Sequence, residues 1–239
     1  MTERKLLLIL AAVYFTYMLD FMVMPALTQI FARVFAMNPQ QLGVLVAAYT
    51  FSAAVFGVVG STMLDRFGRK PALLWLYGGF AVAMLLCALA PSYPFLMAAR
   101  IVAGAFGGLV VSMTFSIVGD TVPAERQGAA FGLVMSTFSL SSVVGVPLGL
   151  WMAGLFGWQS IFYFISAACV VILFVVATLP AMNAHIAAAR DRTFAMRLQA
   201  IFGRRSNLSA FLSTALVAVA SYTIVPFLNP YFVANVGFT

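Results

Sequence analysis

Long apolar runs separated by short polar or charged breaks form the dominant pattern along this chain of 239 residues. Seven of the runs reach about 20 residues, the length that crosses about 30 Å of hydrocarbon at 1.5 Å per residue. They cover residues 6–27, 41–63, 71–91, 94–118, 127–150, 159–180 and 208–235. Because the runs are continuously apolar and do not alternate, we predict membrane-spanning α-helices and not the strands of a barrel.

The composition is that of an integral membrane protein. Hydrophobic residues make up 64% of the chain and charged residues 8%, so a water-soluble fold could not bury this much apolar surface. The first thirteen residues resemble a secretory signal, but the apolar run continues past Asp20 to Leu27 without a clear cleavage site. We therefore expect an uncleaved first span. Cys87 and Cys169 lie within spans, where we expect them to pack as small apolar side chains.

The basic residues predict the orientation in the membrane. With a cytoplasmic N-terminus, eleven of the 13 Lys and Arg residues face the cytoplasm, Arg33 faces outward and Arg100 lies within a span. This asymmetry follows the positive-inside rule. We predict a multi-pass protein of the plasma (inner) membrane with its N-terminus in the cytoplasm. The net charge of +7 then faces anionic lipid headgroups and does not call for a nucleic-acid partner.

A polar, basic segment interrupts the apolar pattern at residues 181–206. Within it, apolar residues recur at helical spacing and form one stripe, at Phe194, Leu198, Ile201 and Phe202. Five arginines surround this stripe. We predict an amphipathic linker helix on the cytoplasmic membrane surface, which follows a six-span unit at residues 1–180.

Small residues recur at every fourth position on three of the predicted spans. They are Ala53, Gly57 and Ser61 on the second span, Gly104, Gly108, Ser112 and Ser116 on the fourth, and Gly128, Gly132, Ser136, Ser141, Gly145 and Gly149 on the fifth. Small faces let helix backbones approach closely in lipid, where no hydrophobic force draws helices together. The ladders indicate either plain helix packing or interfaces that move.

Two formal charges lie deep within the spans, Asp20 and Arg100. An isolated charge in the membrane is costly, so each is a functional-site candidate. Counted from the outer ends of their spans, their depths are about 15 Å and about 9 Å. An arginine side chain can cover that difference, so we hypothesise that the two groups face one central cavity, in contact or nearly so. Their roles are then proton or substrate coupling, or alternatively a buried pair that only fixes packing.

The segment between the second and third spans contains a concentrated charge motif. It reads Ser61-Thr62-Met63-Leu64-Asp65-Arg66-Phe67-Gly68-Arg69-Lys70. This segment resembles the signature loop of the major facilitator superfamily, Gly-x-x-x-Asp-Arg-x-Gly-Arg-Lys/Arg. Spacing, residue types and position between spans agree, and only the first glycine differs, replaced by the small Ser61.

Further stretches along the chain are similar to the same family. The fourth-helix pattern is present as Leu96, Arg100 and Gly104, with an acid at the inner end of that helix at Asp120. The antiporter pattern of the fifth helix is present in part, as Ser141, Gly145 and Gly149 with the proline one place late at Pro147. Asp20 and Pro25 resemble the first helix of the family's drug and sugar exporters.

The resemblance implies a fold and a set of roles. The fold is an all-α membrane protein with a six-helix bundle of two inverted three-helix repeats, and a complete transporter has two such bundles. The charged loop would form a cytoplasmic gate, in which Asp65 caps or pairs with a helix of the second bundle and Arg69 binds Asp120. The other gate residues are Arg66, Gly68 and Lys70. The residues expected to serve helix packing and conformational change are Gly104, Gly108, Ser141, Gly145, Pro147 and Gly149.

Seven spans hold the first bundle, the linker and, at residues 207–239, the opening helix of a second bundle. We expect a fragment of a longer protein, and the alternative is a half-length protein that associates with a second chain. The missing C-terminal bundle, or that second chain, is therefore a predicted partner, together with the lipid bilayer.

The function predicted from these features is secondary transport. A small organic solute of drug or sugar type would cross by alternating access, with proton-linked export as the favoured form. The alternative is a non-transporting membrane protein that acts through assembly. No metal-ligand cluster, nucleophile triad or phosphate-binding loop occurs in the sequence, so we predict neither an enzyme nor a cofactor. Aromatic side chains could line the substrate cavity or only pack, namely Tyr14, Tyr17, Tyr49, Phe131 and Phe138.

Overall fold

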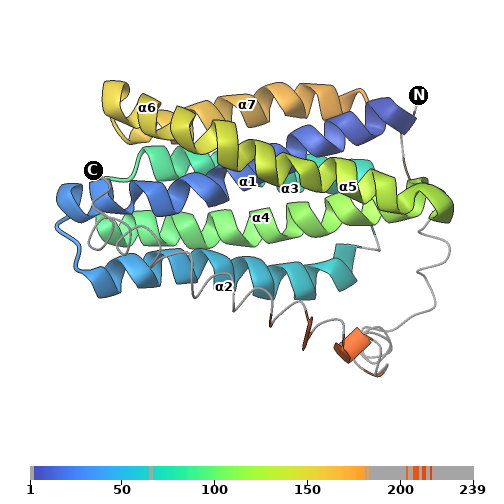
Figure 1. Cartoon of the computed structure of the whole chain (residues 1–239), viewed down its shortest axis with the longest axis horizontal. Helices are drawn as coiled ribbons and strands as arrows, with labels where there is room; N and C mark the ends of the chain where they lie inside the picture. Colours follow the sequence, from blue (N-terminus) through green and yellow to red (C-terminus); the bar gives the residue numbers. More distant parts are fainter. Residues whose placement is uncertain are drawn as a thin grey trace, which may run out of the picture. The chain divides into compact units, whose positions relative to one another are not determined.

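The computed structural model describes residues 3–64, 67–180, 182, 203, 207–209, 212–213 and 216. The regular secondary structure of these residues is entirely helical. Its named elements are α1 (Glu3–Val34), α2 (Pro39–Leu64), α3 (Arg69–Ala88), α4 (Tyr93–Thr121), α5 (Ala124–Leu140), the π-helical η1 (Ser141–Gly145), α6 (Val146–Phe156) and α7 (Gln159–Ala177). Figure 1 shows these elements side by side, with their axes running along the long dimension of the bundle.

Six stretches of the described residues are long and apolar enough to cross a membrane. The helices α5, η1 and α6 form a single stretch, Ala124–Phe156, so the six stretches correspond to the first six predicted spans. The first helix is longer than predicted, because α1 continues to Val34 through Pro25. The seventh span and the linker helix fall almost entirely outside the described residues and stay predictions, as do the domain boundaries near residues 180 and 206.

The bundle consists of two three-helix units. The first is α1, α2 and α3, and the second is α4, the continuous stretch α5–η1–α6, and α7. Each contact of a helix of one unit with the other unit has a counterpart made by the equivalent helix of the other unit. In the first unit α2 packs against α4 of the second, and in return α5 and α6 pack against α1. Similarly, α3 packs on α4 as α7 packs on α1, and the two third helices, α3 and α7, pack on each other. This reciprocal pattern is the one expected for two repeats related by a pseudo-two-fold axis, as predicted.

Local signals set the ends of several helices. Before α2, the Asn38 side chain accepts a hydrogen bond from the Gln41 backbone N–H at 2.8 Å, and the Gln41 side chain accepts one from the Asn38 N–H at 3.0 Å. This is a capping box, which satisfies free donors at a helix start. Pro71 lies in the first turn of α3, where its missing N–H costs nothing because that turn has no partner for it.

Glycines of α4 bring it into direct contact with the α2 backbone. A Cβ added to Gly104 would lie 2.4 Å from the Tyr49 carbonyl oxygen, and one added to Gly108 would lie 2.1 Å from that of Ala53. The Ser52 hydroxyl donates to the Ile101 carbonyl at 2.7 Å across the same interface. Part of the predicted small-residue ladder is thus a close helix contact.

The ladder on the fifth span divides into two parts. Gly145 and Gly149 face α1, where an added Cβ would meet the side chains of Leu19 and Val23 at 2.4 and 2.8 Å. In contrast, no described atom lies within 4 Å of a Cβ built on Gly128 or Gly132. No described helix therefore packs against Gly128 and Gly132, the first part of this ladder.

A π-helical turn interrupts the span that was predicted to be regular α-helix. It covers Ser141–Gly145 and ends shortly before Pro147. Proline has no N–H to donate to the preceding turn, so a change of hydrogen-bond register just before it avoids part of the loss. Such π turns are frequent at functional sites, and this one packs against α1 near Asp20, with Ser141 donating to the Phe15 carbonyl at 3.3 Å.

Candidate functional site

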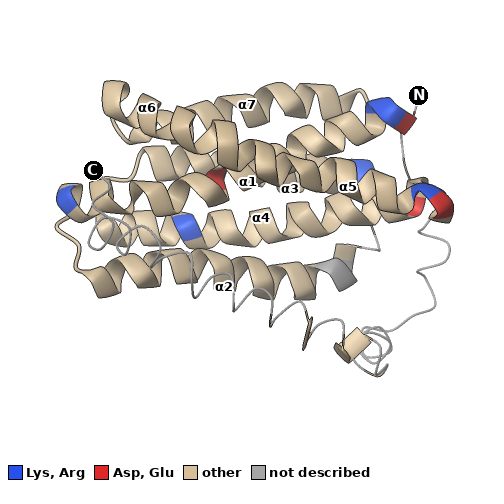
Figure 2. Ribbon diagram, viewed as in Figure 1, with Lys and Arg blue, Asp and Glu red and all other residues tan. Residues whose placement is uncertain are grey.

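The charges within the bundle interior form an ion pair between α1 and α4. The Arg100 Nη1 group donates to Asp20 Oδ1 at 2.6 Å, and neither side chain is more than 1% exposed. In Figure 2 the other charges of the described residues gather at the ends of the helices. The structure therefore brings together the two residues that sequence reasoning selected, and burial makes each depend on the other for compensation of its charge.

Side chains from all of the first four helices surround this pair. The ring of Tyr49 on α2 lies under the guanidinium group, with 4.1 Å between the Arg100 Cζ atom and the ring centroid. Tyr49 is 2% exposed, and Cys87 on α3, also buried, lies close enough to interact with Arg100. A cation held over an aromatic face gains further electrostatic stabilisation, which strengthens in a desolvated site.

Four buried polar atoms of this cluster have no hydrogen-bond partner among the described residues. They are Asp20 Oδ2, Tyr49 Oη and Arg100 Nε and Nη2. We expected the pair to open onto a central cavity, but the described helices enclose both side chains. Of the aromatic residues suggested as cavity lining, Tyr14 and Tyr49 are buried in ring–ring contacts, whereas Phe138 is exposed.

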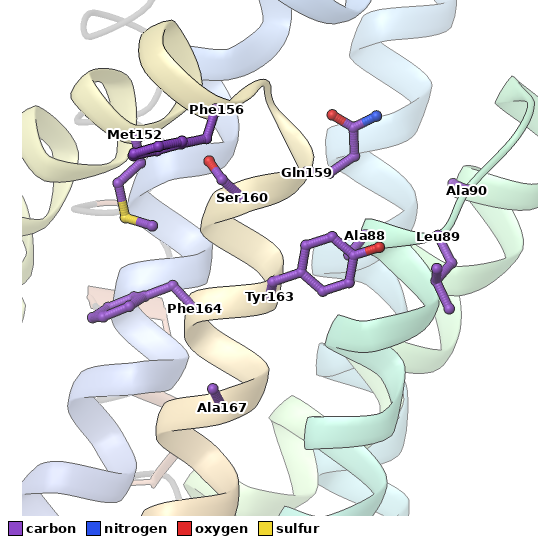
Figure 3. A pocket seen from close by; sticks show the side chains of 10 residues that line it. All are labelled: Ala88, Leu89, Ala90, Met152, Phe156, Gln159, Ser160, Tyr163, Phe164 and Ala167. Atoms are coloured by element: carbon purple, nitrogen blue, oxygen red, sulfur yellow. The ribbon is translucent and has the colours of Figure 1, made fainter.

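A groove of about 880 Å³ lies elsewhere, between α3, α6 and α7 (Figure 3). Its lining includes no charged residue, and neither Asp20 nor Arg100 takes part in it. Figure 3 shows Tyr163 and Phe164 pointing to opposite sides of α7, Tyr163 toward Ala88 and Leu89 at the end of α3. We therefore treat the groove as separate from the ion pair.

The second predicted site lies at the N-terminal end of α3. The Arg69 Nε group donates to Asp120 Oδ2 at 2.8 Å, with the side chains 6% and 36% exposed. The Arg69 backbone N–H donates to the Met182 carbonyl at 3.1 Å, which ties the start of α3 to the chain beyond the end of α7. The pair implied by the family resemblance thus forms within this chain.

The structure describes two of the other four predicted gate residues. Gly68 precedes α3 as its N-cap residue, and Lys70 is half-buried in the first turn. Asp65 and Arg66 lie outside the described residues, so their predicted roles stay predictions.

Sequence reasoning missed two polar contacts made by residues at the start of α5. The Gln127 side-chain amide donates to the carbonyls of Gly119 and Val122 at 3.0 and 3.1 Å, and so satisfies free acceptors at the end of α4. Arg126 pairs with Glu3 at 2.9 Å and connects the starts of α5 and α1. A polar side chain shortly after a helix end is a signal for the first contact, whereas the second depends on tertiary packing alone.

The described residues also bear on metal binding. Among them, no three His, Cys, Asp or Glu side chains come together in a way that could hold a metal ion.

Comparison with known proteins gives consistent matches over nearly the whole chain. A family model described as Major Facilitator Superfamily matches residues 9–239. The uncharacterised MFS-type transporter YfhI of Bacillus subtilis is 26% identical over 221 residues, which cover 92% of this chain and 54% of the relative.

Solved structures show the same fold at lower identity. A bacterial homologue of the human lysosomal transporter Spinster, inward-facing and unoccupied, is similar with a TM-score of 0.75 and 16% identity, over 100% of this chain and 58% of its own. The proton:xylose symporter XylE gives a TM-score of 0.68 at 17% identity, over 86% of this chain and 51% of its own. The chain thus spans about half the length of the relatives it matches.

Proposed function

The chain belongs to the major facilitator superfamily, whose members are membrane transporters and not enzymes, and on this premise we propose that it serves proton-linked export of a small organic solute by alternating access. The solute class is the drug or sugar type suggested by the first-helix motif. Alternating access takes two bundles, and we propose that a second bundle packs against the six-helix bundle described here.

The observation that best supports proton coupling is the buried contact between Asp20 and Arg100. A carboxylate without solvent access is charged only while a cation compensates it, and protonation of Asp20 would cancel that attraction. Arg100 would then be a buried cation without its counter-ion, and a rearrangement that gives it water or another acceptor would be favoured. Protonation and conformation are linked in this way, as a proton-coupled carrier requires.

The Arg69–Asp120 pair supports a latch at the predicted cytoplasmic end. Asp120 is 36% exposed, so the pair sits at a wet boundary where an ion pair costs little to break. We propose that this contact holds one state of the transporter and opens in the other, and that Asp65 and Arg66 extend the latch toward the second bundle.

Glycines with open surroundings support a proposal for the surface that faces the second bundle. Gly43 on α2, Gly119 on α4, Gly128 and Gly132 on α5 and Gly154 on α6 have no described atom within 4 Å of an added Cβ. Of these only Gly128 and Gly132 lie one helical turn apart, so they form a continuous small face. Small faces of this kind favour close helix contacts. We propose that the first part of α5 faces the partner bundle.

A transport assay in inside-out vesicles tests the proton-linked part of the proposal. Vesicles that contain the protein are given a panel of fluorescent cationic and sugar-like probes, with a pH gradient and after its collapse by an ionophore. We expect accumulation of at least one probe that needs the gradient and that Asp20→Asn abolishes. Glu3→Gln is the matched control, since it removes a carboxylate of a partly exposed pair and should leave accumulation intact. Accumulation that ignores the pH gradient would contradict proton coupling.

A further inference from the structure

The unpartnered polar atoms around the ion pair are complementary in their hydrogen-bonding character. Arg100 Nε and Nη2 are donors, Asp20 Oδ2 is an acceptor, and the Tyr49 hydroxyl is either. All belong to side chains that are at most 2% exposed. Buried polar groups are nearly always satisfied by protein or by ordered water, so a cluster of four such atoms indicates a bound polar species.

The geometry of the guanidinium group narrows the choice of that species. The Nε and Nη2 donors lie on the same edge of the planar group and point in the same direction. Asp20 Oδ1 uses Nη1, the Tyr49 ring covers one face of the group, and the Cys87 thiol, a weak acceptor, lies near it. Neither Nε nor Nη2 has a hydrogen-bond partner among the described residues, so this edge can still take a strong acceptor. An anion would add a second negative charge beside Asp20, whereas a neutral molecule that both accepts and donates matches all four atoms.

We propose that Asp20, Tyr49 and Arg100 form a binding site for an internal water molecule, and that this water passes the proton to and from Asp20. The water oxygen accepts from the free edge of Arg100 and donates to Asp20 Oδ2, and the Tyr49 hydroxyl holds it in place. Tyr49 is thus a positioning residue.

The proton step balances as an exchange with one incoming proton. One O–H bond of the bound water breaks as the O–H bond of Asp20 forms, while the water oxygen takes a proton from a solvent hydronium ion on the lone pair that does not bind Arg100. This exchange takes place in the state of the transporter that admits solvent, and it leaves neutral water both at the site and in the solvent. Release runs in reverse. The second half of the proposal rests on the proton-linked function proposed above, whereas the water site does not.

The titratable groups that face Asp20 come from several helices. They are Tyr49 on α2, Cys87 on α3, Arg100 on α4 and Cys169 on α7. The charged residues of α5, Glu125 and Arg126, lie in its first turn at the end of the bundle, and η1 and α6 have none.

A structure of the protein in a lipid nanodisc, at a resolution that shows ordered water, tests the site directly. We expect a density peak within hydrogen-bond distance of Asp20 Oδ2 and of the Arg100 edge. The absence of such a peak, or a rotated Arg100 that binds both oxygens of Asp20, would overturn the water site.

Infrared spectroscopy of the same preparation tests the proton step. Protonated Asp20 is identified by a carbonyl band that appears at low pH and is absent in Asp20→Asn. Tyr49→Phe keeps the ring over Arg100 and removes only the hydroxyl, so we expect this band to shift and protonation after a pH jump to slow about three- to tenfold, the effect of one net hydrogen bond. The matched control is Tyr77→Phe, a buried tyrosine whose hydroxyl bonds to Thr16 at 2.7 Å, and it should leave both unchanged.

The possible failures are distinct. If Tyr49→Phe changes the Asp20 carbonyl band and the protonation rate no more than Tyr77→Phe does, Tyr49 does not position the bound water. If no carbonyl band of Asp20 appears at any pH, the proton-linked function fails, and the density alone then decides the water site.

Discussion

The pair Asp20 and Arg100 yields the sharpest prediction on stability. At 2.6 Å, and with the effective dielectric constant of about 20 that suits buried protein sites, the Coulomb attraction is about 6 kcal/mol. Most of this only offsets the cost of removing two charges from water. The consequence is that the pair contributes little net stability, whereas the loss of one partner leaves the other buried and uncompensated.

The perturbations are Asp20→Asn, Arg100→Gln and the double variant. We expect each single substitution to lower the free energy of unfolding by about 3–5 kcal/mol, the usual cost of a broken buried pair. The double variant removes both charges, so it should be no less stable than either single variant. The coupling energy of the cycle is then about 3 kcal/mol or more.

Steric trapping in lipid bicelles measures these free energies without denaturant. The control cycle is Glu3→Gln with Arg126→Gln, a pair at 2.9 Å whose side chains are 33% and 62% exposed and whose coupling should fall below about 1 kcal/mol. If the effects of Asp20→Asn and Arg100→Gln simply add, the two charges do not depend on each other, and the reasoning from burial is refuted.

Two further variants test the remaining contacts. Gly108→Val places side-chain atoms against the α2 backbone, so we expect a loss of about 2–3 kcal/mol in the same unfolding assay. The control Gly154→Val, which meets no described atom within 4 Å, should change stability little. Arg69→Gln removes a pair at a wet boundary, so stability should fall by about 1 kcal/mol or less while the transport rate changes several-fold. A large change in stability with unaltered transport would mean that the Arg69–Asp120 pair is only structural. The control is Arg126→Gln, which should leave transport unaltered.

Sequence reasoning found the six spans of the first bundle because the apolar pattern alone determines membrane crossing. Helix ends were less certain, as at α1, which continues seven residues past the predicted end at Leu27. Residues 28–34, beyond that predicted end, mix polar and apolar side chains, a pattern that fits either a helix or a loop. Hydrogen bonds and packing decide between the two, and neither is visible in hydropathy.

The partnership of Asp20 and Arg100 was predictable for a simple physical reason. Two opposite charges deep in apolar spans have few ways to be compensated other than by each other. The position of Tyr49 over the guanidinium was not predictable, because an aromatic residue on a third helix can face any direction until the helices are packed. The π turn at Ser141–Gly145 was likewise invisible, since residue spacing does not report hydrogen-bond register, although Pro147 is in retrospect its signal.

Arg69 connects to the rest of the bundle through two chemically different groups. Its side chain binds Asp120, whereas its backbone N–H binds the Met182 carbonyl, a bond that any replacement other than proline retains. Substitutions of Arg69 by residues other than proline therefore test only the side-chain bond to Asp120 and leave the backbone bond to Met182 in place. Arg69 is the first residue of α3, the helical position that accepts proline most readily, so Arg69→Pro would break both links while the helix stays intact. The difference between Arg69→Gln and Arg69→Pro isolates the backbone contribution.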